Sequence, residues 1–320
     1  MLQFDFPNWI DPVIFSAGPI QLTWYALAYM AGLVAGWHLI RRRVVADQFG
    51  LSAEDIDDFV IYALLGVILG GRIGTFVFGW GAGEGLGEQL RLLFWPVQYD
   101  ADGSWTLALS GMSFHGGFLG VVLATVLFWY RKKRAFSLWG FADYLALVAP
   151  IGLFFGRIAN FINRELYGRL AGEGAWFRVS FSPENNPMPG HDYFQTRLNI
   201  CLDGAQAPAN LCREYFDLVA YRHPSQLYEA AGEGVLLFAI AVFLYCQPAI
   251  RNCAGFVTGT FIAGYGLIRT LVEFVRSYDD GVGLNALGLS RSQELSLPMI
   301  ALGLALMIWA WRARERERAA

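Results

Sequence analysis

The sequence is poor in charged residues. Only 16% of its 320 residues are Asp, Glu, Lys or Arg, whereas soluble domains carry about a quarter. The mean hydropathy is +0.39, and several apolar runs approach the ~20 residues that cross a bilayer as a helix. This shortage of charge excludes an ordinary soluble enzyme and predicts a polytopic membrane protein, for which we expect no nucleic-acid partner.

Other absences narrow the class further. No Lys or Arg precedes Arg41, so the first apolar run lacks the basic region of a cleaved signal peptide and is expected to stay as a helix. The four cysteines show no CxxC or Cys/His spacing, so we expect no metal and no cofactor. Neither a Gly-x-Ser-x-Gly motif nor paired catalytic aspartates occur, which argues against an intramembrane hydrolase.

Hydrophobic periodicity predicts an all-α integral membrane protein, one polytopic unit over residues 1–320. Seven helices are expected to cross the membrane, roughly at Gln21–Ile40, Ile56–Gly79, Met112–Tyr130, Phe141–Ile162, Gln226–Cys246, Ala254–Glu273 and Leu295–Trp311.

Basic residues predict the orientation. Arg41–Arg43, Arg131–Arg134 and Arg312–Arg318 all fall on one side, while the short loops opposite are nearly free of Lys and Arg until Arg276 and Arg291. The positive-inside rule therefore places the N-terminus outside and the C-terminus in the cytoplasm, as an odd number of spans requires.

Two long segments are expected outside. Residues 80–111 form a glycine-rich segment that is typical of a loose loop. Residues 163–225 are long enough for a small periplasmic head domain between the fourth and fifth spans. Cys201 and Cys212 in this head could form a disulfide or stay free, and both possibilities are open.

Polar residues of six predicted helices fall in one layer. At 1.5 Å per residue, Arg157 lies about 24 Å along its outward-running helix. The other members of the layer are Tyr25, Arg72, His115, Tyr228, Glu229 and Arg269. An ionisable group inside the membrane is costly and by default marks a functional site, so the layer predicts a site in the outer third of the bilayer.

Structural roles for these groups stay open. Arg269 could pair with Glu273 one turn later on its own helix. Glu229 and Glu233 could serve as structural partners for arginines on neighbouring helices. Arg157 has no acidic residue one turn away on its own helix, so a purely structural role explains it least well.

The chemistry of the layer points to an anionic lipid. Guanidinium groups such as those of Arg157 and Arg269 stay charged and bind phosphate in a forked geometry. A phospholipid phosphodiester is the abundant anion at this depth. His115 could take a proton near neutral pH or be a satisfied interfacial histidine. For Arg72, extension of the side chain to the interface is favoured over a role in ligand binding. Arginines and a base beside a phosphodiester suggest group transfer with a stabilised leaving group.

Specific motifs support this interpretation. The stretch from Gly156 to Gly168, Gly-Arg-Ile-Ala-Asn-Phe-Ile-Asn-Arg-Glu-Leu-Tyr-Gly, resembles the signature of the bacterial prolipoprotein diacylglyceryl transferase family. The resemblance extends in order along the chain through Asp11–Ser16, Trp24-Tyr25, Gly70–Gly74, Gly111–Gly117, His223–Glu229 and Gly264–Arg276. Ala159 replaces a glycine of many members, and residues 170–221 contain no motif that aligns.

The resemblance implies an activity and a site. Members of the family work in the bacterial inner membrane, with an active site toward the outer leaflet. They transfer the diacylglyceryl group of phosphatidylglycerol to the lipobox cysteine of preprolipoproteins and release glycerol phosphate. It implies catalytic roles for His115, Arg269 and Tyr25, with His115 either as base or as a hydrogen-bond partner of the headgroup. It further implies phosphatidylglycerol binding by Arg157, Asn160, Tyr265 and Glu273, and a shaping role for Glu165 and Gly168.

Two other classes of protein compete with a transferase. A transporter or flippase for an anionic phospholipid would use the same arginines. However, the similar stretches Gly70–Gly74 and Phe155–Ala159 lie on helices expected to run in the same direction, unlike the inverted repeats of many transporters. A chaperone that binds secreted proteins through the head is the other possibility.

Overall fold

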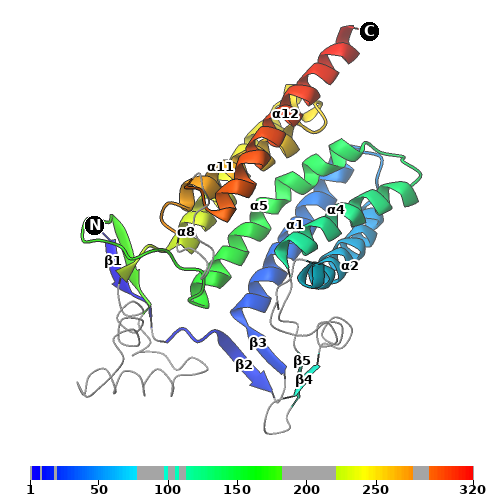
Figure 1. The fold of residues 1–320 in the computed structure, drawn as a ribbon. Coiled ribbons are helices and arrows are strands. Elements are labelled where there is room, and N and C mark those ends of the chain that lie inside the picture. The colour runs from blue at the N-terminus through cyan, green and yellow to red at the C-terminus, as the bar shows by residue number, and fades with distance from the viewer. Residues whose placement is uncertain are drawn as a thin grey trace, which may run out of the picture. The chain divides into compact units, whose positions relative to one another are not determined.

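The protein is mostly helical (Figure 1). The computed structural model describes residues 2–7, 9–17, 20–77, 97–99, 105–107, 113–181, 221–276 and 288–319. The helices are α1 (Trp24–Ala46), α2 (Ala53–Val77), α4 (Phe114–Arg131), α5 (Leu138–Ile162), α8 (Ser225–Glu229), the π-helix η2 (Ala230–Leu236), α9 (Leu237–Cys246), α10 (Pro248–Arg251), α11 (Phe256–Val272) and α12 (Arg291–Ala319).

Short strands accompany the helices. They are β1 (Leu2–Asp5), β2 (Val13–Ala17), β3 (Ile20–Thr23), β4 (Val97–Tyr99), β5 (Trp105–Leu107), β6 (Phe177–Ser180) and β7 (Tyr221–Arg222). The prediction of an all-α protein is therefore too strict. Such strands of two to five residues give little periodic signal in the sequence, because alternation needs several residues to be recognised.

Helix occurs in each of the seven segments that were predicted to cross the membrane. Within the described part of the chain, four helical segments are long and apolar enough to do so, at Ala53–Phe76, Leu138–Ile162, Ser225–Cys246 and Ser292–Arg316. Apolar helices of this length need a hydrocarbon environment to cover their outward faces. The protein is thus a helical, multi-pass membrane protein, while the number of spans and their direction stay predictions.

The described chain divides into two compact units, residues 1–15, 22–33 and 146–320 in one, and residues 16–21 and 34–145 in the other. In the second unit, α2 and α4 pack through glycines (Figure 1). A Cβ added at Gly66 would lie 2.5 Å from the carbonyl oxygen of Gly120, and one at Gly74 would lie 2.6 Å from Cα of Gly116. The two helices therefore approach each other closely at these glycines.

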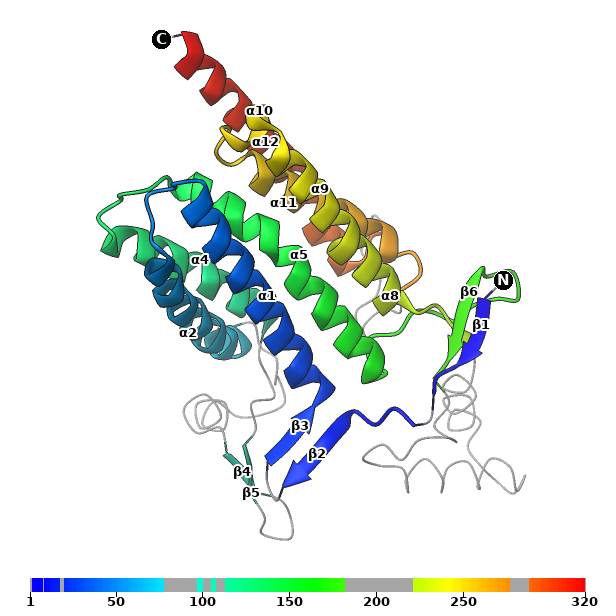
Figure 2. The ribbon, with the colours of Figure 1, turned by 180° about the vertical axis from the view of Figure 1, so that it is seen from behind.

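In the first unit, the π-helix η2 packs against both α5 and α11. A Cβ at Gly234 would lie 2.7 Å from Cβ of Phe154 on α5, and one at Gly232 would lie 2.6 Å from Cγ2 of Ile268 on α11. The helices α11 and α12 lie side by side in Figures 1 and 2. Small residues therefore bring η2 close to the two helices that carry Arg157 and Arg269.

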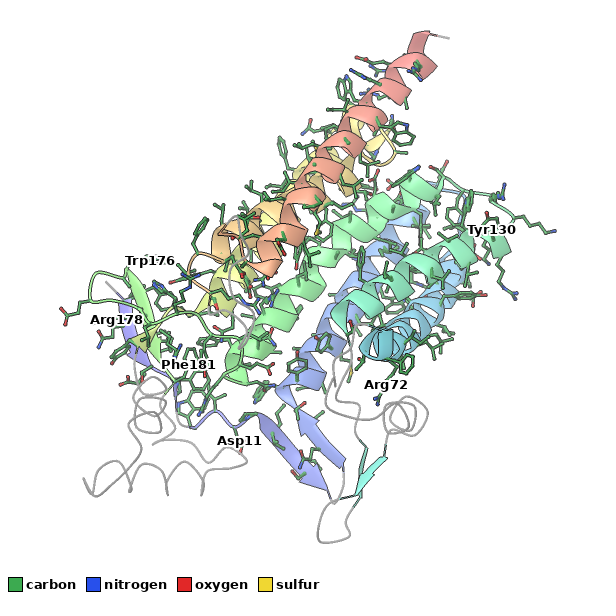
Figure 3. The ribbon with its side chains drawn as sticks, in the orientation of Figure 1. Asp11, Arg72, Tyr130, Trp176, Arg178 and Phe181 are labelled. Atoms are coloured by element: carbon green, nitrogen blue, oxygen red, sulfur yellow. The ribbon has the colours of Figure 1, made fainter. Side chains whose placement is uncertain are left out.

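A small sheet of order β1-β6-β7 joins the N-terminus to the segment that follows α5 (Figure 2). β1 runs parallel to β6, with Leu2 opposite Phe177, and β7 is antiparallel to β6. Phe6, Val179 and Phe181 form its buried core, and Figure 3 labels Phe181 beside this sheet. β6 and β7 belong to the predicted head segment, but residues 182–220, with Cys201 and Cys212, lie outside the described residues. A separate head domain stays a prediction.

Strands β4 and β5 pair antiparallel, with Val97 opposite Leu107. They fall inside the glycine-rich segment 80–111, so this segment is not wholly loop. Its remaining residues lie outside the described part of the chain.

Candidate active site

The arginine of the signature motif lies near the end of α5. Arg157 donates from Nε and Nη2 to Oε2 of Glu233, at 3.2 and 3.1 Å. Its third nitrogen, Nη1, lies 3.1 Å from Oε2 of Glu229. Both carboxylates are fully buried, so Arg157 is held by acids from a neighbouring helical segment rather than from its own helix.

Glu229 also bridges the other arginines. Its Oε1 lies 2.5 Å from Nη1 of Arg269 and 3.1 Å from Nη1 of Arg276. Arg269 additionally contacts Glu273 one turn later, at 3.4 Å, and donates to the hydroxyl of Ser292 at 2.9 Å. The predicted pair of Arg269 with Glu273 is therefore present, but the contact of Arg269 with Glu229 is the shorter one.

The spacing of the two glutamates explains why both reach one arginine. Glu229 ends α8 and Glu233 lies four residues later in η2. Side chains four residues apart lie on the same face of an α-helix, and this remains nearly true in the wider turn of a π-helix. The prediction that Glu229 and Glu233 are partners of arginines on neighbouring helices is confirmed.

A second polar group surrounds the end of α5. The amide of Asn160 donates to Oε1 of Glu165 at 2.7 Å and to the hydroxyl of Tyr25 at 3.3 Å. The backbone N–H of Glu165 bonds to the carbonyl of Asn160, and the carbonyl of Glu165 accepts from the amide of Gln226 at 2.6 Å. Helix α1, the end of α5 and the start of α8 are thus tied together at one place.

Arg164 does not share a helical face with Arg157 and Asn160. The three residues have helical spacing, but α5 ends at Ile162 and Arg164 has a φ of +56°. Its guanidinium instead lies over the ring of Phe6, 4.3 Å from the centroid. The helix ends here because residues in the left-handed region break the i→i−4 hydrogen-bond pattern.

Gly168 lies where three backbone segments meet. Its N–H donates to the carbonyl of His223 at 2.8 Å, and it forms a β-bridge with Arg276. A Cβ added here would lie 2.5 Å from the carbonyl oxygen of Val275 and 2.6 Å from that of His223. Only glycine fits such an approach, which supports the expected shaping role of Gly168.

The ion cluster is charge-balanced. Three arginines (Arg157, Arg269, Arg276) face three glutamates (Glu229, Glu233, Glu273), all buried or nearly so. Removing one member of a buried ion pair leaves the other uncompensated and typically costs about 3–5 kcal/mol. The cluster therefore has a structural function in addition to any role toward a ligand.

The structure brings most of the predicted site residues into two neighbouring groups of one compact unit. Arg157, Arg269 and Glu273 belong to the ion cluster. Tyr25, Asn160 and Glu165 form the hydrogen-bonded group at the end of α5. Tyr265, on α11, interacts electrostatically with Arg157 and Glu233.

His115 belongs to the first turn of α4, after the N-cap Ser113, in the other unit. Its side chain lies outside the described part of the structure, so its predicted role stays a prediction.

Sequence reasoning missed several members of this site. Arg276, Ser292 and Gln226 were not assigned to it. Glu233 was considered only as a structural partner, whereas Glu229 was placed in the polar layer but given no role toward the ligand. A signal was present, because two acids in an apolar run must find cationic partners within the protein. Arg269 and Arg276 lie close together in the sequence, but their spacing does not indicate that one carboxylate bridges both.

The structure is that of a helical, multi-pass membrane protein with a buried arginine–glutamate cluster and a backbone junction that only glycine fits. Residues 12–309 match the family model described as prolipoprotein diacylglyceryl transferase. The chain is 42% identical over 301 residues to phosphatidylglycerol–prolipoprotein diacylglyceryl transferase of Azospirillum brasilense, with 94% of each chain covered. It is 40% identical to the Rhodospirillum rubrum enzyme (94% and 92% covered) and 42% identical to that of Burkholderia multivorans (92% of each). The chain belongs to the prolipoprotein diacylglyceryl transferase family.

Proposed function

We propose that this protein transfers the diacylglyceryl group of phosphatidylglycerol to the lipobox cysteine thiol of preprolipoproteins, releasing glycerol phosphate. Its relatives carry this activity in their names and align with it over more than nine-tenths of its length. The observation that carries the proposal is the placement of Arg157 and Arg269, which share the carboxylate of Glu229. Two guanidinium groups so close together suit the non-bridging oxygens of one phosphodiester.

The reaction is a nucleophilic displacement. The thiol of the substrate, with an ordinary pKa near 8.5, loses its proton to a base, for which His115 is the candidate. The thiolate then attacks the glycerol carbon bonded to phosphate oxygen, so that a C–S bond forms and the C–O bond breaks. Arg157 and Arg269 stabilise the charge that develops on the departing glycerol phosphate. The nucleophile belongs to the substrate, so the reaction needs none of the protein's own cysteines.

The remaining predicted residues have supporting roles in this proposal. Tyr25 and Asn160, joined to Glu165, hold the end of α5 and thereby the position of Arg157. Tyr265 and Glu273 flank Arg157 and Arg269 and help to orient them toward the headgroup. Gly168 fixes the path of the chain between α5 and α8.

We place the protein in the bacterial inner membrane with seven spans, an external N-terminus and a site that opens to the outer leaflet. The clusters Arg41–Arg43, Arg131–Arg134 and Arg312–Arg318 support this orientation. Residues 163–225 would then lie outside, where a secreted preprolipoprotein arrives. Such a site would meet both substrates on the same side of the membrane.

The direct test is reconstitution. Purified protein is incubated with phosphatidylglycerol and a lipobox peptide, and we expect a thioether-linked diacylglyceryl peptide together with free glycerol phosphate by mass spectrometry. A peptide with Ser in place of the lipobox Cys is the matched control and should not react. Lipid movement without a thioether product would contradict the proposal and would favour a transporter.

A further inference from the structure

The forked edge of Arg157 is already occupied. Nε and Nη2 together form the edge that binds carboxylate or phosphate in a bidentate manner, and both donate to a single oxygen of Glu233. Nη1 faces Glu229. A phosphodiester that bound to this edge would therefore have to share the edge with Glu233 or displace Glu233 from it.

Charge balance makes the arrival of an anion costly. The cluster of three arginines and three glutamates has a formal charge of zero. A bound phosphodiester would give it a net negative charge in a site where little water is available to screen it. Uptake of one proton by a glutamate would restore the balance.

The contacts single out Glu233 among the three acids. Glu229 contacts all three arginines, so its protonation would weaken three ion pairs. Glu273 is held next to Arg269 on the same helical stretch, while its backbone carbonyl accepts from Arg169. Within the described residues, Glu233 and Glu273 each contact one arginine, and each has a buried oxygen without a hydrogen-bond partner. Glu233 differs in that its arginine is Arg157, which donates to it from both Nε and Nη2.

The groups that face Glu233 come from every segment packed against it. They are Arg157 on α5, Glu229 on α8, and Arg269 and Tyr265 on α11. The second acid of this set, Glu229, keeps its partners Arg269 and Arg276 when Arg157 binds another anion. Among the described residues, Glu233 would then have no arginine at a comparable distance, because Arg157 is the arginine that it contacts. Glu233 is therefore the acid whose negative charge the ligand replaces.

We infer that Glu233 is a placeholder for the lipid phosphate: it holds Arg157 in position in the empty site, and it takes up one proton and yields the forked edge when an anionic phosphodiester binds. Glu233 is thus a positioning residue that acts through Arg157, and headgroup binding is coupled to proton uptake. The inference rests on the proposed function, because the anion is taken to be the phosphodiester of phosphatidylglycerol.

Calorimetry of the full-length protein in detergent tests this inference. Short-chain phosphatidylglycerol is titrated at neutral pH in buffers of different ionisation enthalpy, which gives the number of protons taken up on binding. We expect about one proton for the wild type and about none for Glu233→Gln. The wild-type Kd should then rise by up to about tenfold per pH unit above neutrality, whereas that of Glu233→Gln should stay flat.

Glu315→Gln is the control, because it removes an exposed carboxylate that lies outside the cluster. It should keep the wild-type proton uptake. Absence of uptake in the wild type, unchanged uptake in Glu233→Gln, or its loss in Glu315→Gln would each overturn the inference. Short-chain diacylglycerol, which lacks the phosphate, should bind without proton uptake.

A second measurement covers the case in which Glu233→Gln does not fold. Infrared difference spectra of the wild type with ¹³C-labelled glutamate should gain a protonated-carboxyl band when the headgroup binds, and no gain would overturn the inference. Transfer to a lipobox peptide is assayed on the same samples. Transfer without proton uptake contradicts the inference alone, whereas proton-coupled binding without transfer contradicts the proposed function alone.

Discussion

The carboxylate of Glu229 contacts three guanidinium groups. It is fully buried and lies at most 3.1 Å from the nitrogens of Arg157, Arg269 and Arg276. A neutral side chain at this position would leave three buried cations with two acids. The environment around Glu229 therefore contributes to folding as well as to chemistry.

We expect Glu229→Gln to destabilise the protein by about 3–5 kcal/mol, because it leaves buried arginine uncompensated. Thermal unfolding in detergent measures the change. Glu315→Gln is the control, since Glu315 is exposed and accepts one hydrogen bond from Trp311, and it should stay within about 0.5 kcal/mol of the wild type. A Glu229→Gln variant as stable as this control would contradict the bridging role.

Gly168→Ala should lose stability and transfer activity together. The new methyl group would lie 2.5 and 2.6 Å from two backbone carbonyl oxygens, and overpacking of this kind costs about 1–3 kcal/mol or more. Gly172→Ala is the matched control, because a Cβ at Gly172 meets nothing within 4 Å. Unfolding curves and transfer assays on both variants check this prediction, and equal behaviour of the two would refute it.

His223 makes stability depend on pH. Burial lowers the pKa of His223 below its ordinary value of 6.5, because the folded environment disfavours the charged imidazolium. The unfolded chain then binds more protons than the folded one as pH falls below about 6.5, so this contribution to stability is present above that pH and is lost on acidification. As pH falls through this range, the melting temperature of the wild type should decrease more than that of His223→Gln; parallel curves would count against the assignment.

At the scale of elements, helices were predictable and their irregular features were not. Apolar runs located α1, α2, α4, α5, α11 and α12, because a membrane helix needs a long continuous signal. The π-helix η2 has no such signal, since Ala230–Leu236 reads as ordinary helix by periodicity. The π-helix therefore became visible only in three dimensions.

The same limit applies to the site. The sequence indicated that Arg157, Asn160, Arg269 and Glu273 matter, because polar groups in apolar runs demand partners. It could not indicate which carboxylate meets which arginine, because those contacts join α5, α8 and α11 across long sequence separations. The end of α5 at Ile162 agrees with the predicted span, but the sequence did not indicate the left-handed φ of Arg164 that follows it.

The helix pair α2–α4 provides a prediction at this scale. Gly74→Ala places a methyl group 2.6 Å from Cα of Gly116, backbone against backbone. We expect a loss of about 1–3 kcal/mol on thermal unfolding. Gly152→Ala on α5 is the control, because a Cβ there meets nothing within 4 Å, and alanine favours the helix by up to about 1 kcal/mol. Equal stability of the two variants would mean that the helices do not pack through these glycines.

At the scale of the whole molecule, the proposed orientation has a direct test. Cys246 is exposed and Cys253 is buried. Cys246 is the last residue of the predicted fifth span, at its cytoplasmic end, and Cys253 follows it. In a variant with Cys201→Ser and Cys212→Ser, a membrane-impermeant maleimide should label Cys246 in inverted membrane vesicles and not in intact spheroplasts. Labelling in spheroplasts instead would reverse the orientation, and Cys253 should stay unlabelled in both preparations.

The parallel pairing of β1 with β6 has a consequence for biosynthesis. Gln3 is synthesised well before its partner Arg178, which lies 175 residues later in the chain. Strand β1 must therefore stay unpaired while several helices are synthesised and inserted. Closing so long a loop is an entropically demanding late step, so β1 is among the last segments to reach its native place. A fusion at the amino terminus would slow the pairing of β1 with β6, whereas a fusion at the carboxy terminus would not affect it.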